Sequence, residues 1–218
     1  MLTEKSTYDE MDAMLRKCIR LDLPKNLRDR LVRARLKGEK YIFYRMLVPG
    51  TRQPVLIIRN TDIKIFSPIL VLDGREGEGY AFKTRYGITV IESHAIRRYF
   101  NRHEHMDEEK VKTLADIDPD IVKRVVHSML ADMDVAVSVH NDTETAEECY
   151  YDGGVFLVNS TDNMDHFYSY VMNRQTFPDQ RQRSLKSETN QRKKRAMLTP
   201  TNAKLFARID TAKAIAGL

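Results

Sequence analysis

The sequence of 218 residues is poor in the features that define several large protein classes. Its two cysteines, Cys18 and Cys149, lie far apart and belong to no Cys-x-x-Cys pair, so a disulfide framework and a zinc cluster are disfavoured. No apolar run approaches the ~20 residues that span a bilayer. The first residues, MLTEKSTYDEMDAML, are acidic and polar, whereas a secretory signal is basic and then apolar. We therefore expect a cytoplasmic protein without a membrane contact.

The sequence also lacks the short motifs of common nucleotide-binding and hydrolytic sites. It has no Walker A loop, Rossmann glycine pattern, His-Glu-x-x-His or Gly-x-Ser-x-Gly. The glycine-rich segment DGREGEG at 73–79 has no lysine and no following helix, so we interpret it as a connection between strands. His94, His103 and His105 include a His-x-His pair, but the ligand set is incomplete and a metal site is the minority interpretation. No cofactor is expected.

Charge is distributed unevenly along the chain, although the net charge is only +5. Residues 174–218 carry 11 basic and 3 acidic side chains, and residues 91–173 carry 7 basic and 17 acidic ones. The basic C-terminal part includes an uninterrupted group of cations: Arg192, Lys193, Lys194 and Arg195. Such polarity suits contact with a polyanion, and a solvated tail with charged helix faces explains it equally well.

Two helices are predicted near the N-terminus. Residues 4–21 show helical spacing of apolar residues, which Pro24 interrupts. A second helix over 24–37 buries a leucine face, and Gly38 suits its C-terminal end. The remaining face of this second helix is basic: Arg28, Arg30, Arg33, Arg35 and Lys37. We expect a helical hairpin over 1–40 that docks on nucleic acid or covers one end of a sheet.

From residue 41 the pattern changes to β-branched and aromatic runs separated by turn-forming segments. The runs are 41–48, 54–59, 63–72 and 80–91. Their short connections predict consecutive antiparallel strands in a meander that closes near Glu92. Pro68 argues for an edge strand or a break in the third run. Several aromatic residues could stack bases, but core positions are favoured for them: Tyr41, Phe43, Tyr44, Tyr80, Phe82 and Tyr86.

The second half predicts further helices and strands. Residues 116–134 have one apolar helical face, on which we interpret His127 as a partly buried helical residue and not as a catalyst. Residues 135–139, VAVSV, predict a short strand. Residues 148–159 predict a β-hairpin, and residues 166–173 fit either a strand or a short helix.

The predicted fold class is α+β. The helical hairpin (1–40) precedes a core domain (41–177), which contains central helices and an antiparallel sheet of about six strands. A basic arm (178–218) follows, extended or disordered at first and weakly helical towards its end.

The candidate site is a polar stripe on a helix that follows the last strand of the meander. Ser93 offers an N-cap, and His94, Arg98 and Arg102 follow at spacings of four residues, which places them on one helix face. Histidine can transfer protons near neutral pH, and arginine binds phosphate through two hydrogen bonds. In the alternative interpretation the arginines are solvated or paired with Glu92 or Asp107.

The pattern Ser93-His94-Ala95-x-x-Arg98-x-x-x-Arg102 resembles the opening helix motif of RelE/BrnT-like toxin-fold proteins. In that superfamily a small antiparallel sheet carries basic and histidine residues that cut or bind RNA. The resemblance covers about ten residues. It departs from the family in the spacing of the serine, in the greater chain length and in the position of the helix. What it implies here is phosphate handling.

The sequence leaves two functions open and does not decide whether the protein is an enzyme. The first is a nucleic-acid-directed protein, as a metal-free endoribonuclease of toxin type in which His94 transfers protons, with RNA favoured over DNA as the partner. Its nucleic-acid-binding residues would be Arg98, Arg102, Arg192, Lys193, Lys194 and Arg195. The second is a non-catalytic phage or mobile-element accessory protein whose basic ends bind nucleic acid or an acidic protein. A homo-oligomer is compatible with either function.

Overall fold

The computed structural model describes residues 1–18, 21, 25–39, 41–60, 66–84, 87–103, 113–140, 148–151, 154–161 and 163–172. Within these residues the helices are α1 (Tyr8–Lys17), α2 (Leu27–Leu36), α3 (Ser93–His103) and α4 (Pro119–His140), with a short 3-10 helix, η2 (Leu114–Asp116). The strands are β1 (Tyr41–Leu47), β2 (Pro54–Asn60), β3 (Phe66–Gly74), β4 (Gly77–Lys83), β5 (Ile88–Ile91), β6 (Glu148–Tyr151), β7 (Gly154–Thr161) and β8 (Met164–Met172). The predicted arm lies outside the described residues, and with it Arg192, Lys193, Lys194 and Arg195. None of the described helices combines the length and the apolar character needed to cross a bilayer.

The strands form one sheet in the order β1-β2-β3-β4-β5-β8-β7-β6. β1 to β5 form the predicted antiparallel meander, β8 pairs with β5 in parallel, and β7 and β6 continue antiparallel. The α+β class is confirmed, but the expected number of about six strands is wrong, because the described residues contain eight. The run 80–91 divides into β4 and β5 at a turn in which the Thr84 N–H donates to the Gly87 carbonyl (2.8 Å). Of the segment 166–173, residues 166–172 lie in a strand, β8, and residue 173 lies outside the described residues.

Two local predictions are wrong because their context overrides residue preference. Residues 135–139 lie in α4 and not in a strand. A β-branched residue costs a helix interior at most roughly 0.7 kcal/mol, so a helix that is already propagating continues through such a run. Pro68 lies in β3, which is an interior strand between β2 and β4. The pairing of β3 with β4 begins only at Ile69, so Pro68, which has no N–H to donate, has a paired strand on one side only.

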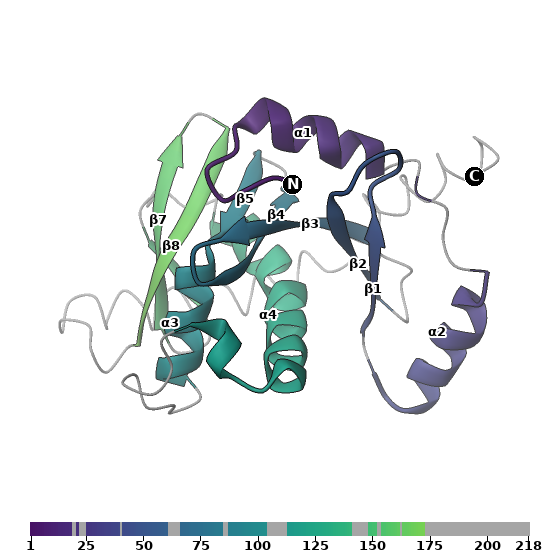
Figure 1. The fold of residues 1–218 in the computed structure, drawn as a ribbon. Coiled ribbons are helices and arrows are strands. Elements are labelled where there is room, and N and C mark those ends of the chain that lie inside the picture. The colour runs from purple at the N-terminus through teal and green to yellow at the C-terminus, as the bar shows by residue number, and fades with distance from the viewer. Residues whose placement is uncertain are drawn as a thin grey trace.

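Helices cover both faces of the sheet (Figure 1). α1 lies against β3, β4 and β5, α2 contacts β1, and α3 and α4 occupy the opposite face from α1. Alternate residues of the central strands pack against the helices on opposite faces of the sheet. In β2, Val55 and Ile57 pack with α1, whereas Leu56 and Ile58 belong to the cluster with α3 and α4. The central strands therefore read as nearly continuous apolar runs, as strands buried on both faces do.

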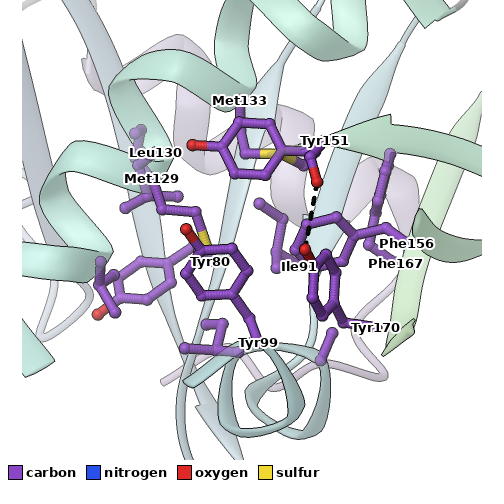
Figure 2. Packing of buried hydrophobic residues seen from close by; sticks show 14 of the residues in the cluster. Tyr80, Ile91, Tyr99, Met129, Leu130, Met133, Tyr151, Phe156, Phe167 and Tyr170 are labelled. Carbon is purple, nitrogen blue, oxygen red and sulfur yellow. Dashed lines mark hydrogen bonds between the residues drawn. The ribbon is translucent and has the colours of Figure 1, made fainter. Parts of the chain in front are cut away.

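An aromatic cluster joins α3 to β6, β7 and β8 (Figure 2). The ring centroids of Tyr99 and Tyr170 are 5.1 Å apart, and those of Phe156 and Tyr170 are 4.7 Å apart. The buried Tyr170 hydroxyl donates to the Tyr151 carbonyl (3.3 Å), which satisfies its need for a partner. A Cβ on Gly154 would lie 2.3 Å from that hydroxyl, so the close approach of the Tyr170 ring to β7 requires a glycine at this position.

β5 leads directly into α3 at one end of the sheet. All residues of β5 are buried, and the Glu92 N–H that follows donates to the Phe167 carbonyl of β8 (3.0 Å). α3 starts at the next residue and packs along β8. His94 therefore lies three residues after the end of a fully buried central strand, in the first turn of α3.

Truncating the aromatic cluster should destabilise the protein. Phe156→Ala removes a fully buried ring, so we expect the free energy of unfolding to fall by about 3–5 kcal/mol, measured by urea denaturation. Tyr168→Ala is the control in β8, because its side chain is 42% exposed, and it should cost less than about 1 kcal/mol. Equal losses for the two variants would contradict this account of the core.

Candidate functional site

The β3–β4 turn is the place where separate parts of the chain meet. Arg75 and Glu76 form the turn between the paired residues Gly74 and Gly77, and Gly77 adopts a φ of +138°, which favours glycine. The Leu114 N–H donates to the Glu76 carbonyl (3.0 Å), and the N-terminal segment pairs with the end of β3. The prediction that segment 73–79 connects two strands is confirmed, but the loop itself is only residues 75–76, because 73–74 belong to β3 and 77–79 to β4.

Ser93 joins the start of α3 to this turn. Its buried hydroxyl accepts the Glu76 N–H (3.2 Å). The prediction that Ser93 is the N-cap is wrong by one position, because α3 begins at Ser93 and the Glu92 carbonyl accepts the Ile96 N–H (3.1 Å). The Ser93 N–H donates to Oε1 of Glu4, so a carboxylate distant in sequence caps the helix and interacts favourably with its dipole.

The side chain of Glu4 fits against the β3–β4 hairpin only because two positions there are glycines. A Cβ on Gly74 would lie 2.2 Å from Oε1 of Glu4, and a Cβ on Gly79 would lie 2.6 Å from the same atom. Burial raises the pKa of the Glu4 carboxyl, and hydrogen bonds from Ser93 oppose part of that rise. The close approach of this side chain to the hairpin therefore explains both glycines.

His94 forms a hydrogen-bonded group with Glu76 and Arg97. Nδ1 of His94 lies 2.9 Å from Oε1 of Glu76, and Nε of Arg97 donates to Oε2 of the same carboxylate. The side chains of Glu76 and Arg97 are largely buried, whereas that of His94 is 36% exposed. Burial by itself would raise the pKa of the Glu76 carboxyl, but hydrogen bonds from Arg97 and His94 hold it below its usual value.

This arrangement orients the imidazole of His94. The carboxylate binds the ring through Nδ1, and Nε2 makes no hydrogen bond to any residue that the structure describes. A ring held at one nitrogen and open at the other can accept or donate a proton at the open nitrogen. We call His94, Glu76 and Arg97 the His94 group.

Arg98 and Arg102 follow His94 along α3. The members of the predicted stripe are separated by about 6 Å of helix rise at each step, so His94 and Arg102 lie about 12 Å apart along the axis. Nη1 of Arg102 donates to the Tyr170 carbonyl of β8 (2.7 Å), and Arg98 is partly buried. The structure thus brings His94 to the β3–β4 turn and Arg102 to β8. Phosphate binding by Arg98 and Arg102 stays a prediction.

The sequence patterns did not indicate two members of the His94 group. Arg97 lies three residues after His94, and that spacing could have indicated it. Glu76 is 18 residues from His94, and the two meet because β4 and β5 are antiparallel neighbours. Glu92, one of the two acidic partners that the alternative interpretation gave the arginines, lies instead 3.7 Å from Nδ1 of His166, and the other, Asp107, lies outside the described residues. No group of three or more His, Cys, Asp or Glu side chains that could hold a metal is found in the described part of the chain.

Two carboxyl groups at the turn should affect the pH dependence of stability in opposite directions. The folded-state pKa of Glu76 is lowered, so its stabilising contribution is present above pH 4.5 and is lost as the pH falls through the folded value. The folded-state pKa of Glu4 is raised, so its contribution is present below pH 4.5 and is lost as the pH rises through the folded value.

Glu76→Gln should therefore lower the free energy of unfolding at neutral pH by about 2 kcal/mol, because a charged hydrogen-bond acceptor is lost. Glu4→Gln is its matched partner: the new amide oxygen can still accept the Ser93 N–H, so stability at neutral pH should be unchanged or higher. Urea denaturation of both variants between about pH 4 and pH 8 measures these effects. A similar loss at neutral pH for both would contradict the assignment.

Comparison with models of protein families, with curated proteins and with solved structures finds no match to this chain. The resemblance of residues 93–102 to RelE/BrnT-like proteins stays a prediction, and the functional interpretation rests on the His94 group.

Proposed function

We propose that the protein acts on RNA as a metal-free endoribonuclease in which His94 transfers protons. The supporting observation is the hydrogen bond between Nδ1 of His94 and the Glu76 carboxylate, with the ring partly exposed. A carboxylate at Nδ1 places the proton there, which leaves Nε2 as an acceptor. Imidazole–carboxylate pairs of this kind orient general bases in unrelated enzymes.

In the proposed reaction, Nε2 of His94 takes the proton of a ribose 2′-hydroxyl. The 2′ oxygen then forms a bond to the neighbouring phosphorus while the bond between phosphorus and the 5′ oxygen breaks. The 5′ oxygen leaves with a proton from water, and the hydroxide that remains takes the proton back from His94. The products are a 2′,3′-cyclic phosphate and a 5′-hydroxyl. Arg98, one helical turn after His94, is the predicted cation best placed to stabilise negative charge on the phosphate.

The charge distribution supports a polyanionic substrate. The C-terminal 45 residues carry 11 basic and 3 acidic side chains, which favours salt-sensitive contact with a phosphate backbone. RNA is preferred to DNA because the proposed chemistry needs the 2′-hydroxyl as its nucleophile. The same charges would hold the substrate without selecting its sequence.

A non-catalytic nucleic-acid-binding protein is the second candidate, and the surface of α2 favours it. Asp29 is the only acidic residue of this helix, whose outer side and C-terminal end expose basic side chains: Arg28, Arg33 and Lys37. Arg30 anchors the helix, since it donates to the Phe43 carbonyl (3.2 Å) and lies over the Tyr44 ring, 4.2 Å from its centroid. In this case a phage or mobile-element accessory factor would bind nucleic acid, or an acidic protein partner, without cutting RNA.

Substitutions in the His94 group distinguish the two candidates. His94→Ala should reduce cleavage of single-stranded RNA by about 10²–10⁴-fold, because proton transfer is lost, while RNA affinity is retained. Glu76→Gln should reduce the rate less and should shift its pH profile, because Glu76 only positions the imidazole. His166→Ala in β8 is the control and should leave the rate unchanged. Tight RNA binding without cleavage in the unsubstituted protein would sink the enzymatic proposal and favour the second candidate.

The cations at 192–195 should contribute affinity and no catalysis. Replacing Arg192, Lys193, Lys194 and Arg195 together by Gln should reduce the salt dependence of RNA binding by a slope of about 3, at roughly 0.7 for each phosphate contact with a single strand. Fluorescence anisotropy at several salt concentrations measures the slope. An unchanged slope would remove these four residues from the interface.

A further inference from the structure

A cavity of about 510 Å³ opens between the sheet and the start of α4, and we call it the β1–α4 pocket. Its sheet side includes Phe43, Leu56 and Tyr80, and its helical side includes Leu114 and Val122. The volume falls within the roughly 300–1,000 Å³ of typical small-molecule sites. Its lining is mostly apolar, with a small number of polar groups, which is also typical of such sites.

An aromatic pair forms one wall of the pocket. The rings of Phe43 and His127 stack with centroids 4.2 Å apart and an interplanar angle of 21°. Burial, with a smaller effect of Lys123, lowers the pKa of His127 to about 4, so the imidazole is neutral at neutral pH. His127 was predicted to be a partly buried helical residue, and it is half-buried in α4. The wall therefore contains two stacked aromatic rings that are both uncharged at neutral pH.

Charged groups lie at the rim. Arg45 of β1 and Glu78 of β4 form a bidentate ion pair with distances of 2.7 and 3.0 Å, and both side chains are about half exposed. Two strands separate β1 from β4, so the pair spans the sheet face above Leu56. The Tyr80 hydroxyl donates to Glu78 (3.2 Å), and the exposed Lys123 adds a second cation. Two cations against one carboxylate leave the rim positive.

The pocket and the His94 group share the β3–β4 hairpin. Gly77 and Glu78, which line the pocket, directly follow Glu76 in the chain. Leu114 also lines the pocket, and its N–H donates to the Glu76 carbonyl (3.0 Å). A molecule in the pocket would therefore lie beside the turn that carries Glu76, the partner of His94.

We infer that the β1–α4 pocket takes an unpaired nucleobase of the RNA on which the His94 group acts, an inference that rests on the proposed function. A base has flat faces that pack against aromatic and aliphatic walls and a polar edge that can meet the Arg45–Glu78 pair. Its phosphate carries the charge that Lys123 attracts. A base paired in a duplex has no exposed face to insert, so the pocket selects single strands.

Binding of the four ribonucleoside monophosphates tests the pocket separately from cleavage. Isothermal titration calorimetry on the full-length His94→Ala protein should detect binding of at least one of them. Adding Lys123→Glu should weaken that binding about tenfold, because the rim then repels the phosphate. Arg124→Glu makes the same change in charge at the next, exposed residue, which does not line the pocket, and should leave the affinity unchanged.

A second variant fills the cavity itself. Val122→Phe places a ring inside the pocket and should abolish monophosphate binding, whereas Val32→Phe adds the same ring at an exposed position of α2 and should not. If Val122→Phe fails to fold, the comparison of Lys123→Glu with Arg124→Glu decides the matter. Competition by single-stranded RNA, and none by duplex RNA, would assign the pocket to a substrate base; a lack of competition by the single strand would overturn that assignment.

The outcomes separate this inference from the proposed function. Monophosphate binding that Lys123→Glu weakens and Arg124→Glu preserves supports the pocket even where no RNA is cut, and in that case cleavage is the part that fails. Cleavage without monophosphate binding, with kcat/KM on single-stranded RNA unaffected by Lys123→Glu and Val122→Phe, overturns the pocket and leaves the endoribonuclease intact. Absence of both binding and cleavage overturns both.

Discussion

The Glu76 carboxylate is the contact on which the geometry of the candidate site depends. It stands in a turn whose backbone is held by Ser93 on one side and Leu114 on the other, and its two oxygens contact His94 and Arg97. A largely buried guanidinium is tolerated only beside a partner of opposite charge, so Arg97 and Glu76 stabilise each other's position. The imidazole then takes its orientation from a carboxylate that is itself fixed. A hairpin turn, which is often a mobile part of a fold, thereby becomes a rigid support.

The sheet was largely predictable because its signals are local. Alternating β-branched and aromatic residues, separated by short turn segments, were sufficient to predict an antiparallel meander of four runs, of which the last divides into β4 and β5. The wrong predictions concern segments whose structure is determined by a neighbouring helix or strand. Residues 135–139 have a strand-like composition, yet they continue α4 because the preceding helix propagates into them. Pro68 favours an edge strand. Because the pairing of β3 with β4 begins only at Ile69, Pro68 lies at a local edge inside the sheet.

The candidate site was predictable only to the extent that it lies on a single helix. Helical spacing places His94, Arg98 and Arg102 on one face, but it carries no information on what stands opposite that face. The partners of this helix come from elsewhere: Glu76 from the β3–β4 turn, Glu4 from the N-terminal segment 89 residues away, and the Tyr170 carbonyl from β8. Such contacts depend on how the segments are arranged in space. The Tyr170 contact in particular depends on the parallel pairing of β8 with β5, which no short motif encodes.

Glu4 also constrains where a phosphate can bind. The free N–H groups at the start of a helix commonly receive an anion, but at α3 the carboxylate of Glu4 already accepts the Ser93 N–H. A second anion there would meet a carboxylate in a half-buried place, where repulsion between like charges is strong. For the proposed function we therefore expect a substrate phosphate to contact side chains on the exposed side of α3 and not the N-terminus of that helix. Of the two arginines in the predicted stripe, Arg98 lies one helical turn from His94 and Arg102 two turns, so Arg98 is the cation nearer to a phosphate whose ribose hydroxyl meets Nε2 of His94 in the proposed reaction.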